Sequence, residues 1–324
     1  MNKRIKNFAL LGLAGYIAPR HLKAIKETGN KLSVTLDKHD NVGIIDSYFP
    51  DADFFTEPER FERHIYKIQH AKDSLPIDFF SICTPNYLHD AHIRMALCNH
   101  ADAICEKPLV LNPWNVDCLA ELEKETGKKI HTILQLRCHP AVVKLKNTID
   151  ADKSNKVYDI TLTYITGRGN WYYYSWKGDE EKSGGLITNI GIHFFDMLYY
   201  LFGELKTNTV HYRTPSWGSG CMHFKKARVR WFLSIDANYL PDSIKQTGKM
   251  SYRSILIDKE ELDFTNGFTD LHTLSYQQIL EGRGFGLDCA KPSIEIVHFI
   301  RNAECLSGVN SADKHPFVHK VKRV

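Results

Sequence analysis

The chain has 324 residues, enough for two domains, and its hydrophobic content of 43% and charged content of 25% are those of an ordinary globular protein. The net charge of +4 is too small to predict a nucleic-acid partner, and no apolar run approaches the about 18–20 residues of a membrane span. The eight cysteines have neither a Cys-x-x-Cys pair nor zinc-ligand spacing. We therefore expect reduced cysteines, no metal site, no membrane segment and a cytoplasmic protein.

The N-terminal residues predict a phosphate-binding loop. Residues 8–11 read as a strand, residues 12–18 as a glycine-containing turn, and the following residues as a helix to about residue 27. Glycine lets the backbone approach a phosphate, and a helix N-terminus offers it free N–H groups. The match to G-x-G-x-x-G is imperfect, because alanine and isoleucine stand at the second and third glycine positions. In this context we expect a dinucleotide cofactor to contact Gly12, Ala14, Gly15, Tyr16 and Ile17.

Asp37 ends a second predicted strand, residues 32–36, about 25 residues after Gly12. A carboxylate at this place can accept hydrogen bonds from both adenosine ribose hydroxyls and would repel a 2′-phosphate, which favours NAD. The alternative is an ordinary turn or helix-start aspartate. The strand, glycine loop, helix and strand before it favour the ribose role.

Strands and helices continue to alternate, with strands predicted at residues 54–55, 77–83, 102–105 and 130–136. This alternation predicts an α/β fold, a doubly wound parallel sheet of the Rossmann type over residues 1–136. The strand at 102–105 ends at Glu106, Lys107 and Pro108. Ligands bind beyond the carboxyl ends of parallel strands, so we expect Lys107 to face the ligand crevice. The alternative is a solvated lysine at a strand end.

The character of the chain changes after about residue 152. Strands are predicted at 157–166, 209–213, 227–238, 251–257 and 260–264 without intervening helices, apart from one apolar helix at 186–201. This pattern predicts an α+β domain over residues 137–324 with a large open antiparallel sheet, closed by helices at 270–280 and 288–305. An apolar sheet face needs a covering partner, so we expect a homo-oligomer.

The helix at 186–201 carries Asn189, His193 and Asp196 at steps of four and three residues, which places them on one face. Such a polar stripe on an apolar helix faces either a satisfied core network or a ligand cleft. A pair of glycines, Gly184 and Gly185, precedes the helix and allows a close approach. We favour the ligand cleft.

Together these residues resemble the glucose–fructose oxidoreductase/inositol dehydrogenase (Gfo/Idh/MocA) family. The resemblance rests on residues 12–18 (GLAGYIA), 84–89 (TPNYLH), 106–108 (EKP), 176–177 (WK) and 184–196. Within the family the chain looks most similar to the UDP-N-acetyl-2-amino-2-deoxyglucuronate 3-dehydrogenases of the WlbA/WbpB type. That likeness rests on residues 14–21 (AGYIAPRH), 41–47 (NVGIIDS), 163–171 (TYITGRGNW), 175–179 (SWKGD) and 228–238 (RVRWFLSIDAN).

The resemblance implies NAD as cofactor and oxidation of the C3 hydroxyl of UDP-N-acetylglucosaminuronate, in bacterial surface-polysaccharide (O-antigen) synthesis. It also implies a homotetramer and 2-oxoglutarate as a hydride acceptor. Further cofactor contacts are expected at Thr84, Pro85, Asn86, His89, Glu106, Lys107, Gln135 and Trp176. Alternatives are a dehydrogenase of another sugar or polyol, and a non-catalytic NAD-binding regulator.

Alcohol oxidation needs a base for the hydroxyl proton and a cation on the oxygen. We assign His193 as the base and Lys107 as the cation, although the two roles can be exchanged if burial lowers the pKa of the lysine. Much of the family has aspartate where this chain has Asn189. Because Asn189 carries no charge, it cannot stabilise a protonated His193 electrostatically, but it can orient His193 or hold a substrate hydroxyl. Cations and aromatic rings suit an anionic nucleotide sugar, and we expect substrate contacts at Lys107, Tyr164, Arg168, Lys177, Asn189 and His193.

Overall fold

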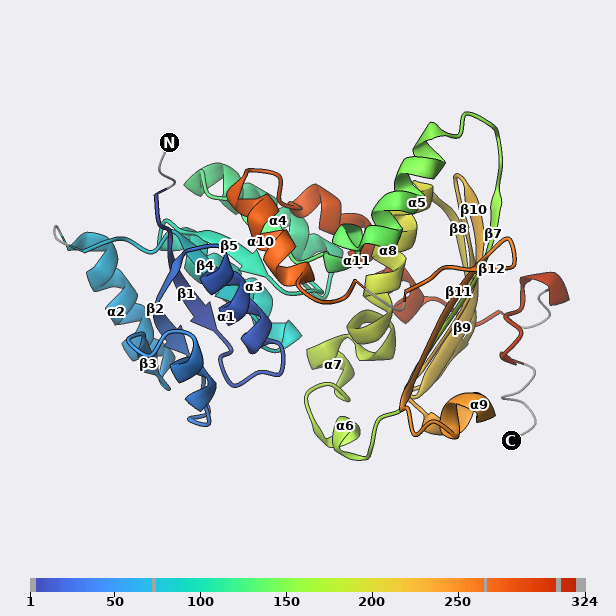
Figure 1. Ribbon diagram of the computed structural model, residues 1–324, viewed down its shortest axis with the longest axis horizontal. Helices are drawn as coiled ribbons and strands as arrows, with labels where there is room; N and C mark the ends of the chain where they lie inside the picture. The colour runs from blue at the N-terminus through green and yellow to red at the C-terminus, as the bar shows by residue number, and fades with distance from the viewer. Residues whose placement is uncertain (1–3, 72–73, 265–266, 307–309, 319–324) are drawn as a thin grey trace. The chain divides into compact units, whose positions relative to one another are not determined.

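The computed structural model describes residues 4–71, 74–264, 267–306 and 310–318 (Figure 1). By packing, the chain forms two compact units, Met1–Cys138 with Phe268–Lys291, and His139–Gly267 with Pro292–Val324. The predicted domain boundary lies at 136/137, with all later residues expected in a second domain. In the structure, the change of unit follows Cys138 and the segment Phe268–Lys291 returns to the first unit.

The first unit is built on a six-stranded sheet in which every pair is parallel and the order is β3-β2-β1-β4-β5-β6. Its strands are β1 (Asn7–Leu11), β2 (Lys31–Leu36), β3 (Asp53–Phe55), β4 (Phe79–Ile82), β5 (Asp102–Cys105) and β6 (Ile130–Thr132). The order reverses direction between β1 and β4, and such a reversal leaves a ligand crevice beyond the carboxyl ends of those strands. The predicted Rossmann sheet is confirmed.

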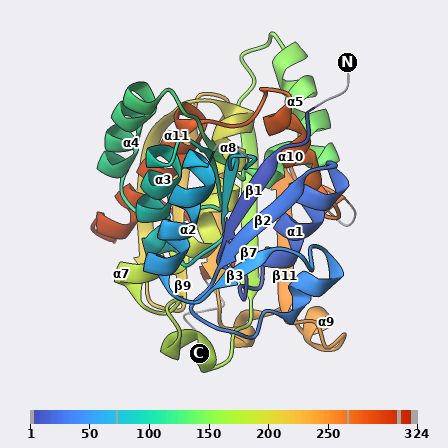
Figure 2. The ribbon, with the colours of Figure 1, turned by 90° about the vertical axis from the view of Figure 1, so that its left-hand side faces the viewer.

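Helices cover both faces of this sheet. They are α1 (Ala18–Glu27), α2 (Pro58–His70), α3 (His89–Cys98), α4 (Pro113–Thr126), α10 (Leu271–Leu280) and the start of α11 (Leu287–Asn302). Figure 2 shows α1 and α10 on one face and α2, α3 and α4 on the other. Because both faces are buried, the central strands are continuous apolar runs, as in β1. Phe8 of β1 stacks on Tyr276 of α10 at 5.9 Å between ring centroids.

The second unit contains a six-stranded sheet of order β12-β11-β7-β10-β9-β8. Its strands are β7 (Tyr158–Thr166), β8 (Leu205–Arg213), β9 (Trp217–Phe224), β10 (Ala227–Ser234), β11 (Ser251–Ile257) and β12 (Glu260–Glu261). Neighbouring strands are antiparallel except β7 and β10, which run parallel. The sheet is therefore mixed, mostly antiparallel. Sequence periodicity does not reveal strand direction, which is why this pair was not predicted.

The helices of the second unit are α5 (Pro140–Ala151), α6 (Trp171–Tyr174), α7 (Glu180–Ser183), α8 (Ile192–Phe202), α9 (Asp242–Lys245) and the rest of α11. Within this unit, α5 and α8 pack together on one face of the sheet (Figure 1). A π-helical turn, Ile187–Gly191, leads directly into α8. Short 3₁₀ turns occupy Gly43–Ser47, Asn86–Leu88, Gln135–Cys138, Ala237–Tyr239 and Ser311–Asp313 of the chain.

The other face of the second sheet is partly covered by the chain itself. Residues 310–318 lie against it: Phe317 packs on Phe232 at 5.5 Å and on Tyr252 at 6.4 Å between ring centroids. The ring of His315 lies 3.1 Å from the hydroxyl of Thr163. This face is therefore less open than the sequence suggests, because the pattern of the strands contains no information on a later segment that folds back over them.

Other differences concern single elements. The helix α5 and the strand β9 were not predicted, and the strand predicted at 130–136 ends at Thr132. Strand β9 contains two glycines, which weaken any strand pattern. A Cβ at Gly220 would lie 2.4 Å from the carbonyl oxygen of Thr209, so this glycine is needed for packing. Among the described residues, no helix has the length and apolar character to cross a membrane.

Candidate active site

Gly12 brings two loops of the first unit into contact at the carboxyl ends of β1 and β4. Its φ is +96°, and its N–H donates to the carbonyl oxygen of Leu36 at 2.8 Å. A Cβ at this position would lie 2.7 Å from the carbonyl carbon of Cys83 and 2.8 Å from the nitrogen of Thr84. Only glycine fits both the backbone conformation and the space. The predicted loop therefore lies at the point where the strand order reverses.

The glycine loop leads into the N-terminus of α1. Turn hydrogen bonds run from Gly15 N–H to the Gly12 carbonyl at 3.0 Å and from Ala18 N–H to the Gly15 carbonyl at 3.1 Å. In the part of the chain that the structure describes, the N–H groups of Tyr16 and Ile17 donate to no protein acceptor, and Ile17 provides no side-chain cap. Unpaired N–H groups at a helix start are suited to an anion.

Asp37 lies directly after β2 and holds the glycine loop. One carboxylate oxygen, Oδ2, accepts the N–H of Ala14 at 2.9 Å, and the other, Oδ1, accepts the N–H of His39 at 2.9 Å. Each carboxylate oxygen has a second lone pair, so both retain capacity for a ligand hydroxyl. The residue predicted to bind the adenosine ribose is thus fixed in orientation.

His89 connects the loops that follow β4 and β5. It is fully buried, with Nε2 2.9 Å from the carbonyl oxygen of Thr84 and Nδ1 2.7 Å from that of Pro108. Burial lowers the pKa of His89, against the raising effect of these two carbonyls. The side chain that the sequence analysis assigned to the cofactor is here occupied by two backbone groups. These contacts join the Thr84–Pro85–Asn86 loop, whose Asn86 is also buried, to the segment that contains Lys107, and the cofactor contact of His89 stays a prediction.

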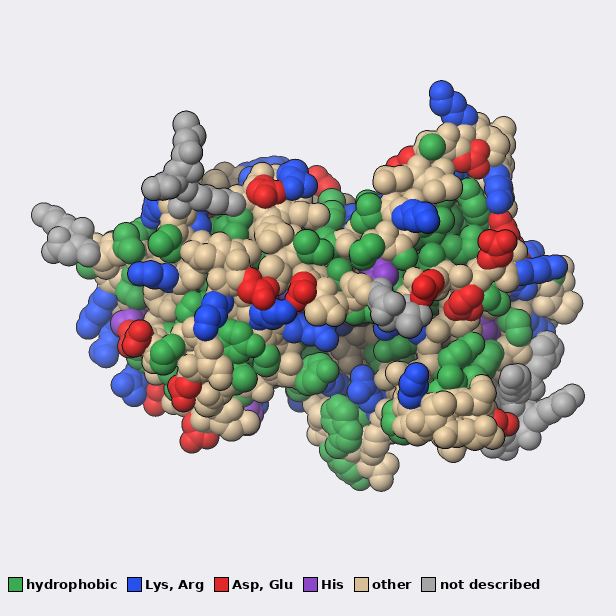
Figure 3. Space-filling view, in the orientation of Figure 1, with side chains coloured by type: hydrophobic (Ala, Val, Ile, Leu, Met, Phe, Trp, Pro, Cys, Tyr) green, Lys and Arg blue, Asp and Glu red, His purple; other side chains and the backbone are tan. Residues whose placement is uncertain are grey.

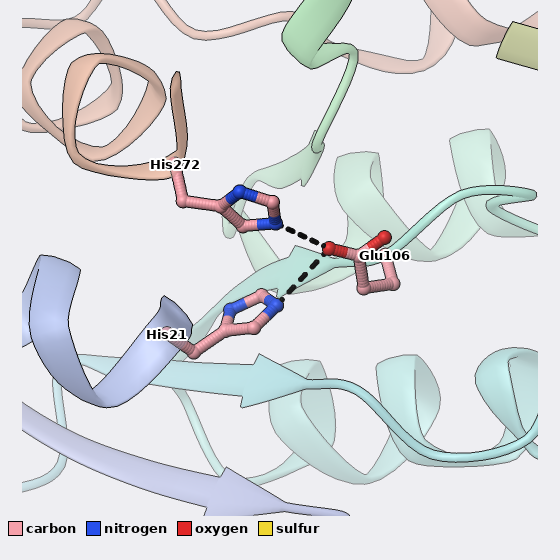
Figure 4. A group of neighbouring side chains, drawn as sticks. All are labelled: His21, Glu106 and His272. Atoms are coloured by element: carbon pink, nitrogen blue, oxygen red, sulfur yellow. Dashed lines mark hydrogen bonds and ion pairs between the residues drawn. The ribbon is translucent and has the colours of Figure 1, made fainter. Parts of the chain in front are cut away.

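Glu106 and Lys107 follow β5, and Glu106 is nearly fully buried. Its Oε1 is 3.1 Å from Nε2 of His21 and 2.8 Å from Nε2 of His272 (Figure 4). Burial raises the pKa of Glu106, but the two histidine hydrogen bonds outweigh it and hold the pKa well below its usual range. His21 and His272 were not predicted. The one signal in the sequence is that His21 lies on the buried face of α1.

Gln135 completes the row of predicted residues at this edge of the first sheet. It begins the 3₁₀ turn Gln135–Cys138 after β6. Its Oε1 is buried and has no hydrogen-bond partner among the described residues. A buried acceptor without a partner is costly unless a ligand or water satisfies it. An amide N–H of a bound ligand would do so.

In the second unit, the π-helical turn precedes the catalytic candidate His193. Asn189 lies within the turn, and its Nδ2 donates to the hydroxyl of Tyr172 at 3.3 Å. His193, in the first turn of α8, is half-buried, whereas Asp196 is buried. The prediction that Asn189, His193 and Asp196 share one helix face assumes α-helical spacing. That spacing holds only from Ile192 onwards, so it relates His193 to Asp196 but not to Asn189. Single π-turns inside helices occur frequently at functional sites.

Arg168 and Lys177 form a positively charged cluster with aromatic rings. The ammonium group of Lys177 lies 5.5 Å from the ring centroid of Trp171 and 5.7 Å from that of Trp176. Burial and the charge of Arg168 lower the pKa of Lys177. Two cations near each other beside partly exposed indole rings favour an anionic ligand. The exposed aromatic residues of α6 form the green protrusion at the lower edge of Figure 3.

The structure brings most predicted residues of each unit together. In the first unit the glycine loop, Asp37 and the segments after β4, β5 and β6 share one edge of the sheet. In the second, Tyr172 links Asn189 to the Arg168–Lys177 cluster, which includes Trp176. Tyr164 belongs to β7, and its ring centroid lies 4.9 Å from that of Phe194 and 5.5 Å from the guanidinium of Arg253.

Two profiles of one family match the chain in succession. "Oxidoreductase family, NAD-binding Rossmann fold" (GFO_IDH_MocA) matches residues 6–133, and "Oxidoreductase family, C-terminal alpha/beta domain" matches residues 146–238. The WlbA (WbpB) dehydrogenase of Thermus thermophilus, solved with NAD and alpha-ketoglutarate, is 51% identical with a TM-score of 0.92, over 97% of this chain and 100% of that chain. Its complex with NAD and UDP-GlcNAcA gives 50% identity and a TM-score of 0.91 over the same shares.

More distant similarity extends to other sugar dehydrogenases. Glucose-6-phosphate 3-dehydrogenase of Bacillus subtilis is 23% identical over 61% of this chain and 54% of its own length. Inositol 2-dehydrogenase of Rhizobium meliloti is 29% identical over 61% of this chain and 55% of its own length. The chain thus matches about half the length of these two relatives.

Proposed function

Since the chain belongs to the Gfo/Idh/MocA oxidoreductase family, we propose that it uses NAD to oxidise the C3 hydroxyl of UDP-N-acetylglucosaminuronate (UDP-GlcNAcA) to the 3-keto sugar. The family and the NAD-binding fold predicted from the sequence motifs are confirmed. The observation that supports the substrate is the 50% identity, over 97% of the chain, to a dehydrogenase solved with NAD and UDP-GlcNAcA. The curated sugar dehydrogenases are only 23% and 29% identical.

The first unit fits NAD on its own evidence. The N–H groups of Tyr16 and Ile17 would hold the pyrophosphate, and Asp37 the adenosine ribose. The buried oxygen of Gln135 needs a donor, and the nicotinamide amide has one. Asn86, Glu106 and Lys107, with Thr84 and Pro85 forming the wall, would contact the nicotinamide ribose. Trp176 of the second unit would contribute an apolar surface.

Bound NAD supplies the acceptor for the hydride that leaves C3. The chain must provide the rest: a base for the hydroxyl proton and a cation that stabilises the developing negative charge on O3. His193 is the proposed base, which contributes roughly 10²–10⁴-fold, and Lys107 the proposed cation. Asn189 would hold a substrate hydroxyl or orient His193 without carrying a charge. If the pKa of Lys107 falls enough in the complex, lysine and histidine exchange roles.

Arg168 and Lys177 are the proposed contacts for the carboxylate or pyrophosphate of the substrate. Lys177 lies near two indole rings and near a second cation, Arg168, so an anion relieves the repulsion between the two positive charges. Tyr164 would contribute through its hydroxyl group, since its ring packs against Phe194 and Arg253.

The test is to incubate purified protein with NAD, UDP-GlcNAcA and alpha-ketoglutarate and to follow the sugar by mass spectrometry. We expect a product about two mass units lighter, and little product from UDP-N-acetylglucosamine, which lacks the C6 carboxylate and leaves a cation unpaired. The Lys177→Met variant should reduce this discrimination. Oxidation of a free sugar or polyol with UDP-GlcNAcA unchanged would contradict the proposal, and no turnover of either would favour an NAD-binding regulator.

We further propose that alpha-ketoglutarate regenerates NAD, by analogy with the Thermus enzyme solved with that ligand. The 3-keto sugar would then enter lipopolysaccharide O-antigen synthesis in the cytoplasm. We also propose a homotetramer, although residues 310–318 already cover part of the sheet face from which an oligomer was inferred. Light scattering that shows a monomer at micromolar concentration would contradict the assembly.

A further inference from the structure

A buried polar network lies beneath the carboxyl end of β5, within the first unit. Glu106 Oε1 lies within hydrogen-bonding distance of His21 from α1 and His272 from α10 (Figure 4). His21 Nδ1 is 2.8 Å from the hydroxyl of Tyr276, which lies 2.6 Å from Oγ of Ser81. Every one of these side chains is buried. The network joins the helix after the glycine loop, two strands of the sheet and the returning segment Phe268–Lys291.

The direction of each hydrogen bond follows from charge. Glu106 is ionised, because its pKa is held well below the usual range, so both histidines donate to it through Nε2. Burial lowers the pKa of His21, which is therefore neutral and accepts at Nδ1. Tyr276 must then donate to His21 and accept from Ser81. Both histidines therefore donate to the same carboxylate oxygen, Oε1. The other oxygen, Oε2, accepts the N–H of Lys107 at 3.3 Å and keeps a second lone pair.

We propose that His21 and His272 are positioning residues that fix the Glu106 carboxylate so that Oε2 is presented to the cofactor. This inference rests on the proposed contact between Glu106 and the nicotinamide ribose. A carboxylate held at one oxygen by two donors cannot rotate without breaking both bonds, so the acceptor offered to a ribose hydroxyl is already oriented before NAD binds. Neither histidine touches the cofactor in this scheme.

The same three side chains are also close enough together to hold a metal ion. The hydrogen-bonded arrangement explains the observed geometry without one, because the nitrogen–oxygen distances of 2.8 and 3.1 Å are those of N–H···O bonds. Metal analysis of the purified protein therefore belongs to the test. Stoichiometric zinc that disappears in a His272 variant would overturn the positioning role.

The test exploits the length of the side chain at position 272. Glutamine places its amide nitrogen about where histidine has Nε2, whereas asparagine is too short to reach Glu106. NAD affinity is measured from pH 5 to pH 8 for wild type, His272→Gln and His272→Asn. In His272→Asn, Glu106 loses one donor while burial still raises its pKa, so protonation begins at higher pH. We expect about tenfold weaker NAD binding at low pH, with near-normal binding at pH 8.

Other groups around Glu106 do not obscure this signal. Cys83 and Cys105 remain neutral thiols because burial and Glu106 itself raise the pKa of both. Lys107 and His89 are the nearby charged or titratable groups on the loops, and they are unchanged in all variants. The matched control is His315→Gln, which alters a buried histidine of the second unit and should leave the NAD affinity profile as in wild type.

The outcomes separate this inference from the proposed function. A His272→Gln profile like that of wild type, with a shifted His272→Asn profile, supports the positioning role. Identical profiles for the two variants would overturn it. Glu106→Gln should weaken NAD binding at every pH. If Glu106→Gln binds NAD as tightly as wild type, Glu106 does not contact the cofactor and the proposed function is revised at that residue, whatever the His272 variants do.

Discussion

Replacing Gly12 by alanine should destabilise the first unit and weaken NAD binding. Two effects add at this position. The φ of +96° is one that L residues rarely adopt, which costs about 1–3 kcal/mol. The new Cβ would also lie 2.7 Å from the carbonyl carbon of Cys83, and such overpacking against backbone costs about 1–3 kcal/mol. We expect Gly12→Ala to lower the free energy of unfolding by about 2–6 kcal/mol.

Two other glycines of the same unit separate these effects. Gly29 has φ +74° but nothing within 4 Å of its Cβ position, so Gly29→Ala should cost only about 1 kcal/mol. Gly43 has neither a positive φ nor a neighbour within 4 Å, and Gly43→Ala should be neutral or slightly stabilising. The difference between Gly12→Ala and Gly29→Ala measures the contact between the glycine loop and the end of β4.

Thermal unfolding and NAD titration are the assays. One kcal/mol corresponds to about 2–4 °C for a domain of about 150–250 residues, so we expect Tm to fall by about 4–24 °C in Gly12→Ala and about 2–4 °C in Gly29→Ala. NAD affinity should fall more than tenfold in Gly12→Ala alone, because the displaced residues belong to both proposed cofactor loops. If Gly12→Ala and Gly29→Ala had equal Tm and equal NAD affinity, the steric reasoning would be refuted.

Lys107→Ala and His193→Ala should each lose roughly 10²-fold or more in kcat while retaining NAD binding, and turnover near the wild-type rate in either would disprove that residue's role. NAD should bind more tightly than NADP, since Asp37 would face the 2′-phosphate; the reverse order in a direct titration would contradict this. Stability should fall as the pH drops below about 6.5, because burial lowers the folded-state pKa of His92 to about 4 and that of His315 to about 3. The unfolded chain then binds protons first, at about 1.4 kcal/mol per pH unit for each histidine down to its folded pKa. Denaturant titrations of wild type and His315→Gln between pH 7.5 and 5 measure this slope, and an equal slope in both would exclude the contribution of His315.

Features defined by local sequence were predicted, and features formed by distant segments were not. Gly12, Asp37 and Lys107 follow apolar strands directly, and parallel strands bring their carboxyl ends to one edge. The network around Glu106 joins His21 to Tyr276 across 255 positions, and no local spacing relates the two. The π-helical turn at Asn189 and the folding back of residues 310–318 likewise depend on what each segment packs against.

The return of Phe268–Lys291 to the first unit determines when that unit can be completed. Strand β6 takes a hydrogen bond partner from this segment, because Thr132 N–H donates to the carbonyl of Phe285 at 2.8 Å. His272 and Tyr276 lie in the same segment. During synthesis, a nascent chain that ends before residue 268 would leave Glu106 without His272, one of its two histidine partners, and β6 without its hydrogen bond to Phe285. The unit that comes first in the sequence therefore reaches its final packing only after residues 268–291 have left the ribosome.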